Sequence, residues 1–188
     1  IADATGCDTT FTVTINEPTA LDVSNVSATD ISCFGANDGT ATIVASGGTS
    51  PYTYQWIDCT SGAQLGTSVP ATGLGPGDYQ VEVTDANGCL DTSTCVTVNE
   101  PTDITGVITP NNITCSGGCD GSAVVVPAGG TAPYTYQWYF NSVAVPGVGA
   151  DNITNVCAGD LTVDVTDANG CTVTLGPVTI TDPAMFDI

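Results

Sequence analysis

One stretch of sequence, Gly-Asp-Tyr-Gln-Val-Glu-Val-Thr-Asp-Ala-Asn-Gly-Cys at residues 77–89, constrains the fold more than any other, because it recurs with few changes at residues 159–171. The end of the same motif also lies at residues 3–7, so that three Gly-Cys pairs follow one another at intervals of 82 residues. A repeat of this length sets the size of the folding unit. The chain of 188 residues therefore predicts two complete units and part of a third.

Each copy of the motif predicts a strand that runs into a tight hairpin. Tyr79, Val81 and Val83 alternate with polar residues, which is the period of a strand with one buried face. The Asp-Ala-Asn-Gly sequence that follows is typical of a turn, in which Gly88 can adopt a positive φ angle. The motif is therefore interpreted as the structural period of the chain.

Prolines mark the boundaries between units, at Pro18, Pro101 and Pro183. A proline at each junction stiffens the connection, which predicts a semi-rigid rod of units. Phe11, Val13 and Ile15 would form one face of a strand whose sheet has to come from outside this segment. We expect the last strand of a preceding, truncated unit at residues 1–18, complete units at 19–101 and 102–183, and the start of a following unit at 184–188.

Each complete unit reads as a series of short strands. Turn signals recur roughly every 8–12 residues, and no segment combines a helical apolar period with helix caps. The fold class expected is therefore all-β, with tandem immunoglobulin-like (PKD-like) β-sandwich repeats of about 82 residues. Aromatic residues that share one face of the third strand are interpreted as core; they are Tyr52, Tyr54 and Trp56, and in the second unit Tyr134, Tyr136, Trp138 and Phe140.

The charge of the chain excludes several classes of function. Lysine, arginine and histidine are absent, against 20 acidic residues, which gives a net charge of −20. Nothing can neutralise a phosphate group, so nucleic acids and anionic membranes are excluded as partners. The chain also lacks a histidine base, a lysine nucleophile and a cation for an oxyanion, so that only a weak hypothesis of a carboxylate hydrolase remains and no catalytic residue is assigned. Bound metal would relieve the self-repulsion, so calcium is the expected cofactor, with no organic cofactor.

The nine cysteines predict disulfide bonds, because no histidine or Cys-x-x-Cys spacing suggests a metal site. Disulfides point to an oxidising compartment, and no apolar run approaches the roughly 20 residues of a membrane span. We therefore expect an extracellular or cell-surface location without membrane insertion.

Two pairing schemes for the cysteines remain open. Comparison of the units gives two bridges in each. Cys33–Cys89 in the first unit and Cys115–Cys171 in the second join cysteines that occur at the same positions in both units. Cys59–Cys95 and Cys119–Cys157 are private bridges, between cysteines that occur in one unit only. In a standard sandwich, however, the Cys33 turn and the Cys89 hairpin lie at opposite ends, which favours a bridge between units from Cys33 to Cys171. Cys59 and Cys95 would also be roughly 9–10 Å apart unless Cys59 lies beyond the end of its strand. Connectivity cannot be deduced from sequence alone.

Calcium would bind where a head-to-tail array brings acidic and amide side chains together at the junctions. The candidates at the central junction are Glu100, Asp103, Asp38, Asp78, Asp167 and Asn169. Those at the upstream junction are Glu17, Asp85 and Asn87. The alternative at each position is that Asp and Asn simply form turns.

A series of motifs recurs in the same order in both units. In the first unit it consists of Ile-Ser-Cys33, Asp-Gly39, Ser-Gly-Gly48, Pro-Tyr-Thr-Tyr-Gln-Trp56, the motif that ends at Cys89, and Asn-Glu-Pro101. This series resembles the SprB-type repeats of Bacteroidetes surface adhesins. The resemblance implies a large, non-enzymatic cell-surface protein, exported by the type IX route and used in adhesion or gliding motility.

We expect the chain to be a structural module, either the stalk of a surface adhesin or the body of an extracellular filament. Its partners would be neighbouring repeats or identical subunits along a rod or filament. The alternative is a binding module for a carbohydrate or protein ligand. Such a ligand would meet the loops at residues 58–68 and 140–150, where the two units differ most.

Overall fold

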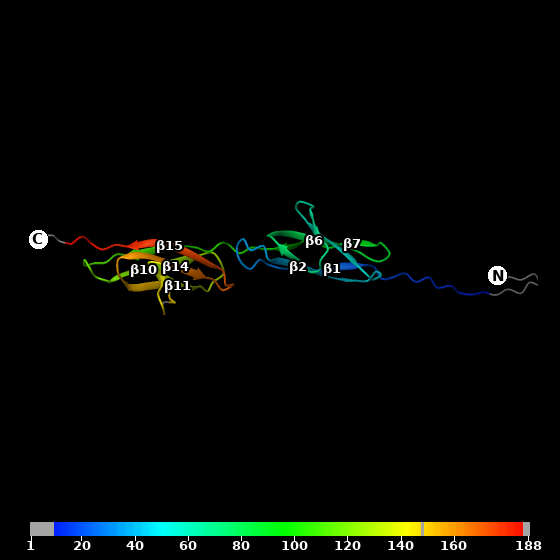
Figure 1. Ribbon diagram of the computed structural model, residues 1–188. Coiled ribbons are helices and arrows are strands. Elements are labelled where there is room, and N and C mark those ends of the chain that lie inside the picture. The colour runs from blue at the N-terminus through cyan, green and yellow to red at the C-terminus, as the bar shows by residue number, and fades with distance from the viewer. Residues whose placement is uncertain (1–9, 148, 186–188) are drawn as a thin grey trace, which may run out of the picture.

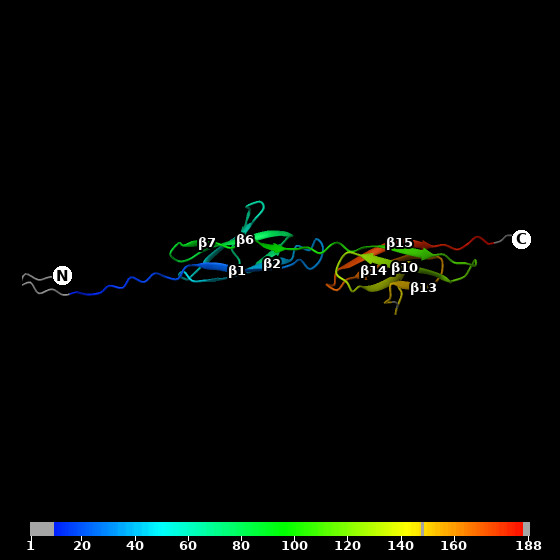
Figure 2. The ribbon, with the colours of Figure 1, turned by 180° about the vertical axis from the view of Figure 1, so that it is seen from behind.

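The computed structural model describes residues 10–147 and 149–185, in which there are fifteen strands and no helix. Two β-sandwiches lie end to end and give the molecule the shape of a rod (Figure 1, Figure 2). The predicted all-β fold class of tandem β-sandwiches is confirmed. Among the described residues, no apolar helix of membrane-crossing length occurs.

The first unit contains eight strands in two antiparallel sheets. The strands are β1 (Asp22–Thr29), β2 (Gly39–Ser46), β3 (Thr53–Asp58), β4 (Gln64–Gly66), β5 (Ala71–Leu74), β6 (Gly77–Thr84), β7 (Leu90–Thr92) and β8 (Val96–Val98). One sheet has the order β1-β2-β5, and the other has the order β4-β3-β6, with β7 and β8 both paired to the outer edge of β6. The break in apolar alternation early in β1 corresponds to an irregular register between Asp22 and Asn25.

The second unit repeats this topology with seven strands. They are β9 (Thr105–Asn111), β10 (Gly121–Ala128), β11 (Thr135–Phe140), β12 (Val143–Ala144), β13 (Asn152–Val156), β14 (Gly159–Thr166) and β15 (Thr172–Ile180). The sheets have the orders β9-β10-β13 and β12-β11-β14-β15. A single strand, β15, takes the place of the pair β7 and β8, with an irregular register between Leu161 and Val163. In the gap between β7 and β8, the hydroxyl of Ser93 accepts a hydrogen bond of 3.0 Å from the N–H of Val81.

The recurrent motif supplies the centre of each core. Tyr79, Val81 and Val83 on β6 are 6%, 0% and 0% exposed, as their alternation predicted. Trp56 on β3 lies beside Val81 of β6, Trp138 on β11 lies beside Val163 of β14, and both tryptophans are buried. The other aromatic residues of the two runs are half-buried and pack against the cores. The interpretation of the aromatic face as core is therefore confirmed.

The residues before the first unit form no strand in the part that the structure describes. Residues 10–20 have no regular secondary structure, and Phe11, Val13 and Ile15 are exposed. A strand needs a partner, and none of the described strands lies beside this segment. The expected turn at residues 3–7, Cys7 and residues 186–188 of the following unit lie outside the described residues.

The bridge between units, Cys33–Cys171, is the one that forms, with Cα atoms 5.6 Å apart. The within-unit scheme is wrong for Cys33–Cys89 and for Cys115–Cys171. Cys33 lies next to the linker, because the neighbouring Ile31 N–H donates to the carbonyl of Asn99, whereas Cys89 follows β6 at the opposite end of the unit. Cys89 and Cys115 are unbonded and exposed.

The two private bridges are present in the structure. Cys59 lies directly after the end of β3, so its Cα atom comes within 6.5 Å of that of Cys95. Cys119 and Cys157 are bonded in the second unit. The three disulfides indicate an oxidising environment.

Candidate functional site

The junction between the two units is the candidate functional site, because a covalent bond there joins residues far apart in the sequence. Three segments meet at it. They are the hairpin at residues 167–171 between β14 and β15, the turn at residues 32–38 between β1 and β2, and the linker at residues 99–104.

Asp167 holds the hairpin of the second unit in shape. Its Oδ1 atom accepts hydrogen bonds of 2.9 Å from the N–H groups of Asn169 and Cys171, and its Oδ2 atom accepts one of 2.9 Å from Thr131. The residue is only 6% exposed. Burial raises the pKa of the Asp167 carboxyl, but the hydrogen bonds from Thr131 and Cys171 outweigh it, so the pKa lies below its usual value. The carboxylate therefore fixes the position of Cys171.

The turn of the first unit is built from local and long-range hydrogen bonds. Asp38 accepts bonds of 2.5 Å from the hydroxyl and 2.9 Å from the N–H of Ser32, which lower the pKa of the Asp38 carboxyl. Gly35 has a φ angle of 76°, and its N–H donates to Glu100 Oε1 over 2.7 Å. The linker residue Glu100 therefore holds the turn that carries Cys33.

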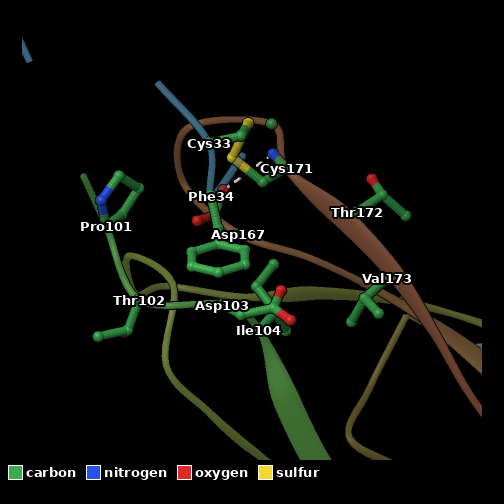
Figure 3. Close-up of a pocket in the computed structure, with 11 residues that line it drawn as sticks. Cys33, Phe34, Pro101, Thr102, Asp103, Ile104, Asp167, Cys171, Thr172 and Val173 are labelled. Carbon is green, nitrogen blue, oxygen red and sulfur yellow. Dashed lines mark hydrogen bonds between the residues drawn. A yellow bond between two sulfur atoms is a disulfide. The ribbon is translucent and has the colours of Figure 1, made fainter. Parts of the chain in front are cut away.

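Two contacts join the units at this point. The first is the Cys33–Cys171 disulfide, and the second is a hydrogen bond of 3.1 Å from Asn169 Nδ2 to the carbonyl of Ser32. Phe34 lies beside them: its ring is directed toward Asp103 and Ile104 in Figure 3, lines a cavity of about 310 Å³ between the units and is 57% exposed. The junction is thus held by a covalent and a polar contact, with an exposed aromatic ring over the cavity between the units.

The predicted calcium ligands are only partly brought together. Asp103 and Asp167 line the cavity beside Phe34, and Glu100 and Asn169 line a neighbouring hollow. In the described ranges, no group of three or more acidic, cysteine or histidine residues is placed to hold a metal ion. Calcium binding at the junction therefore stays a prediction.

The remaining predicted ligands lie elsewhere. Asp78 accepts a hydrogen bond of 2.6 Å from the Thr97 hydroxyl across the sheet. At the upstream end, Glu17 and Asp85 line one hollow of about 470 Å³, while Asn87 donates to the Thr49 hydroxyl over 2.9 Å. Asp38 is engaged by Ser32, as described above.

Sequence reasoning missed two residues of the junction. No role was expected for Phe34, although its counterpart in the second unit is Ser116, so that the two turns differ at this position. Asp30 was not considered; its Oδ1 atom accepts bonds of 2.8 Å and 3.1 Å from the backbone and side chain of Asn99, which secures the start of the linker.

The SprB repeat family model matches residues 25–61 and 107–142, one match in each unit. No curated protein matches the sequence. The two matched segments correspond to each other at the period found in the sequence. The resemblance to SprB-type repeats is thereby confirmed.

Solved structures share the fold. The three N-terminal domains of the bacteriophage RB49 outer capsid protein Hoc match with a TM-score of 0.52 at 18% identity, over 86% of this chain and 59% of that chain. A three-domain immunoglobulin fragment of titin matches with a TM-score of 0.47 at 12% identity, over 88% of this chain and 66% of that one. The chain thus spans less than two thirds of the length of these structures. The chain therefore consists of two immunoglobulin-like sandwiches, each with a segment that matches the SprB repeat model, and a disulfide joins one sandwich to the other.

Proposed function

We propose that this chain is a length of rigid, non-enzymatic stalk in an extracellular protein of the adhesin class, in which the repeats hold a functional end away from the cell surface. The SprB repeats, the end-to-end sandwiches and the disulfides support this role. The net charge of −20 also supports it, because like-charged rods repel one another laterally and remain separate.

The observation that carries the proposal is the second covalent connection at the junction. Two domains joined by a single linker move relative to each other unless a large interface holds them. Here the linker is the first covalent connection between the repeats. The Cys33–Cys171 disulfide, between residues 138 positions apart in the sequence, is the second. The hydrogen bond from Gly35 to Glu100 also ties the linker to the turn that carries Cys33. With two attachments, one repeat can no longer rotate about the linker relative to the other, as it could with the linker alone.

Removing the bridge tests the stalk. We expect the double variant Cys33→Ser/Cys171→Ser to keep both repeats folded but to bend at residues 99–104, because the linker becomes the only covalent connection. Small-angle X-ray scattering would show a lower mean radius of gyration and a broader distribution of maximum dimensions than the parent chain.

The matched control is Cys59→Ser/Cys95→Ser, which removes a bridge inside the first repeat and leaves the junction intact. It should lose stability and keep the extended scattering profile. A parent chain that already scatters as a broadly bent ensemble would contradict the stalk proposal.

Calcium remains the second part of the proposal. A chain with 20 carboxylates and no basic side chain gains from a bound divalent cation, and the exposed Asp103 at the cavity is the carboxylate best placed to attract one. We expect the melting temperature to be higher in millimolar calcium than in EDTA at equal ionic strength, with a smaller effect of magnesium. The variant Asp103→Asn should reduce the difference. An unchanged melting temperature would refute calcium binding but would not contradict the stalk proposal.

A further inference from the structure

The disulfide between the repeats changes the path by which a pull along the rod travels through the chain. Tension enters the pair of repeats beside Pro18 and leaves it beside Pro183, whatever lies before and after these prolines. Without the bridge, tension would pass through every residue in between. With the bridge, tension crosses from Cys33 directly to Cys171, which lies 138 positions further along the sequence.

The segment that leads to Cys33 runs the length of the first repeat. Leu21 lines the hollow at the upstream end of the rod. β1 follows directly, and beyond it the N–H of Ile31 donates to the carbonyl of Asn99 at the start of the linker, over 2.9 Å. β1 therefore connects the upstream end of the rod with the junction.

The segment that follows Cys171 runs along the second repeat in the same way. β15 begins directly after it, at Thr172, and continues to Ile180. At the downstream end, the N–H of Thr181 donates to Asn112 Oδ1 over 3.0 Å. Figure 1 shows β1 and β15 in different halves of the rod, with the C-terminal end beyond β15. β15 therefore connects the junction with the downstream end.

Both of these segments are already extended. A β-strand rises about 3.3 Å per residue, which is close to the greatest length that a chain can reach. Eight residues of β1 and nine of β15 have this conformation, and only residues 30–32 separate β1 from Cys33. A pull on these segments therefore finds little slack, and even separation of β1 from its neighbour β2 adds little length.

The rest of both repeats lies inside the loop that the bridge closes. Residues 34–170 include the linker and the strands from β2 to β14. A free chain of 138 residues spans roughly 450–500 Å when it is fully extended. None of this length is available to a pull while the bridge is intact. Unfolding of the strands inside the loop therefore does not lengthen the rod.

The two private bridges do not limit extension in this way. They close loops of only 36 and 38 residues, one in each repeat. Each leaves more than half of a repeat of about 82 residues free to extend. With these bridges alone, unfolding of one repeat would lengthen the rod by roughly 100 Å.

From this path we propose that Cys33–Cys171 is an extension limit, which makes the pair of repeats a tether of nearly fixed length under tension. The proposal rests on the stalk function, because a stalk transmits pull between its ends. It goes beyond stiffness. Resistance to bending depends on two attachments at the junction, whereas resistance to stretching depends on a covalent path that bypasses the strands inside the loop. β1, the disulfide and β15 carry the load.

Stretching single molecules tests the extension limit. The full chain is held in optical tweezers by handles joined to its two termini, and its length is followed while the force rises. The parent chain should show no step of lengthening that corresponds to unfolding of a repeat. The variant Cys33→Ser/Cys171→Ser should lengthen in two steps of roughly 100 Å each, one for each repeat.

The matched control is Cys59→Ser/Cys95→Ser, whose bridge lies inside the loop closed by Cys33–Cys171. It weakens the first repeat but leaves the covalent bypass intact, so we expect no step, as in the parent chain. Steps of roughly 100 Å or more in the parent chain or in this control would overturn the proposal. A Cys33→Ser/Cys171→Ser chain that lengthens no more than the parent chain would overturn it as well.

Reduction of the parent chain while it is held gives a second measurement that needs no substitution. Dithiothreitol gives two electrons and two protons to each disulfide, which becomes two thiols, and is itself oxidised to its cyclic disulfide. We expect steps to appear only after reduction. They should reach roughly 250 Å for each repeat, because the private bridges open as well. A reduced chain that still does not lengthen would refute the extension limit.

The scattering measurement keeps this result separate from the stalk proposal. A chain that is straight in solution but lengthens in large steps under force refutes the extension limit alone. A parent chain that bends freely in solution refutes the stalk, whatever its length under force.

Discussion

Replacing Trp138 by alanine is expected to lower the free energy of unfolding of the second repeat by about 3–5 kcal/mol. The side chain is fully buried on β11, opposite Val163 of β14, and it is the largest side chain of its core. Its indole N–H also donates to the carbonyl of Ala150 over 3.0 Å. The substitution therefore leaves a large cavity and removes a hydrogen bond in a unit of only about 82 residues.

The measurement can assign the loss to one repeat, because the chain contains two tryptophans, one in each core. In the Trp138→Ala chain, fluorescence reports only on Trp56 and hence on the first repeat. We expect urea unfolding followed by fluorescence to keep the parent midpoint, while far-ultraviolet circular dichroism shows an added transition at lower urea.

The control is Trp138→Phe, which keeps an aromatic ring in the core and loses the hydrogen bond to Ala150. Its loss of stability should be about 1–2 kcal/mol. A loss for Trp138→Ala no greater than for this control would contradict the assignment of Trp138 to a close-packed core.

The sheets could be predicted from the sequence because strand patterns are local. The alternation of Tyr79, Val81 and Val83 identified the buried face, and glycines marked the turns. The division of the last strand of the first repeat could not be predicted in this way. At the division, the Ser93 hydroxyl accepts a hydrogen bond from the N–H of Val81, and a contact between residues 12 positions apart does not appear in a local sequence pattern.

The pairing of Cys33 could not be resolved by comparing the repeats. A shift by one whole period carries Cys89 onto Cys171, so a bond within a repeat and a bond to the next repeat satisfy the same sequence pattern. What decides between them is which ends of neighbouring sandwiches meet. That is set by the linker contacts, such as the bond from Gly35 to Glu100, which no local pattern reveals.

The acidic residues show a different limit of prediction from sequence. Asp is common both in turns and in calcium sites, so the pattern alone predicts either. The structure distinguishes them by their hydrogen bonds: Asp85 and Asp167 each receive bonds from three backbone N–H groups, which is the role of a turn residue. Asp103 is exposed and lines the cavity, and is the candidate with the most freedom to bind a cation.

The variant Asp167→Asn is expected to destabilise the second repeat strongly near neutral pH and little in acid. The amide has one acceptor oxygen in place of two, and its NH₂ group would face a backbone N–H of the hairpin. The native carboxyl has a pKa below its usual value. Its contribution to stability is therefore complete above the pKa of an unfolded aspartate, about 3.9, and is lost as the pH falls through the lower pKa of the folded state.

The pH profile separates this ionic role from a simple loss of shape. In chains that also carry Trp56→Phe, fluorescence reports on the second repeat, so urea unfolding can be compared at about pH 7, 5 and 3. The difference between the chain that keeps Asp167 and the Asp167→Asn variant should remain similar from pH 7 to 5. It should shrink at pH 3, which lies below the pKa of about 3.9 at which the carboxyl of the unfolded chain takes up a proton. The exposed Asp151, whose side chain supports no such hairpin, provides the control Asp151→Asn, which should unfold like the parent at each pH. A constant difference at all three values would mean that the charge of Asp167 does not stabilise the hairpin. A difference that shrinks would show that the ionised carboxylate of Asp167 stabilises the hairpin that carries Cys171.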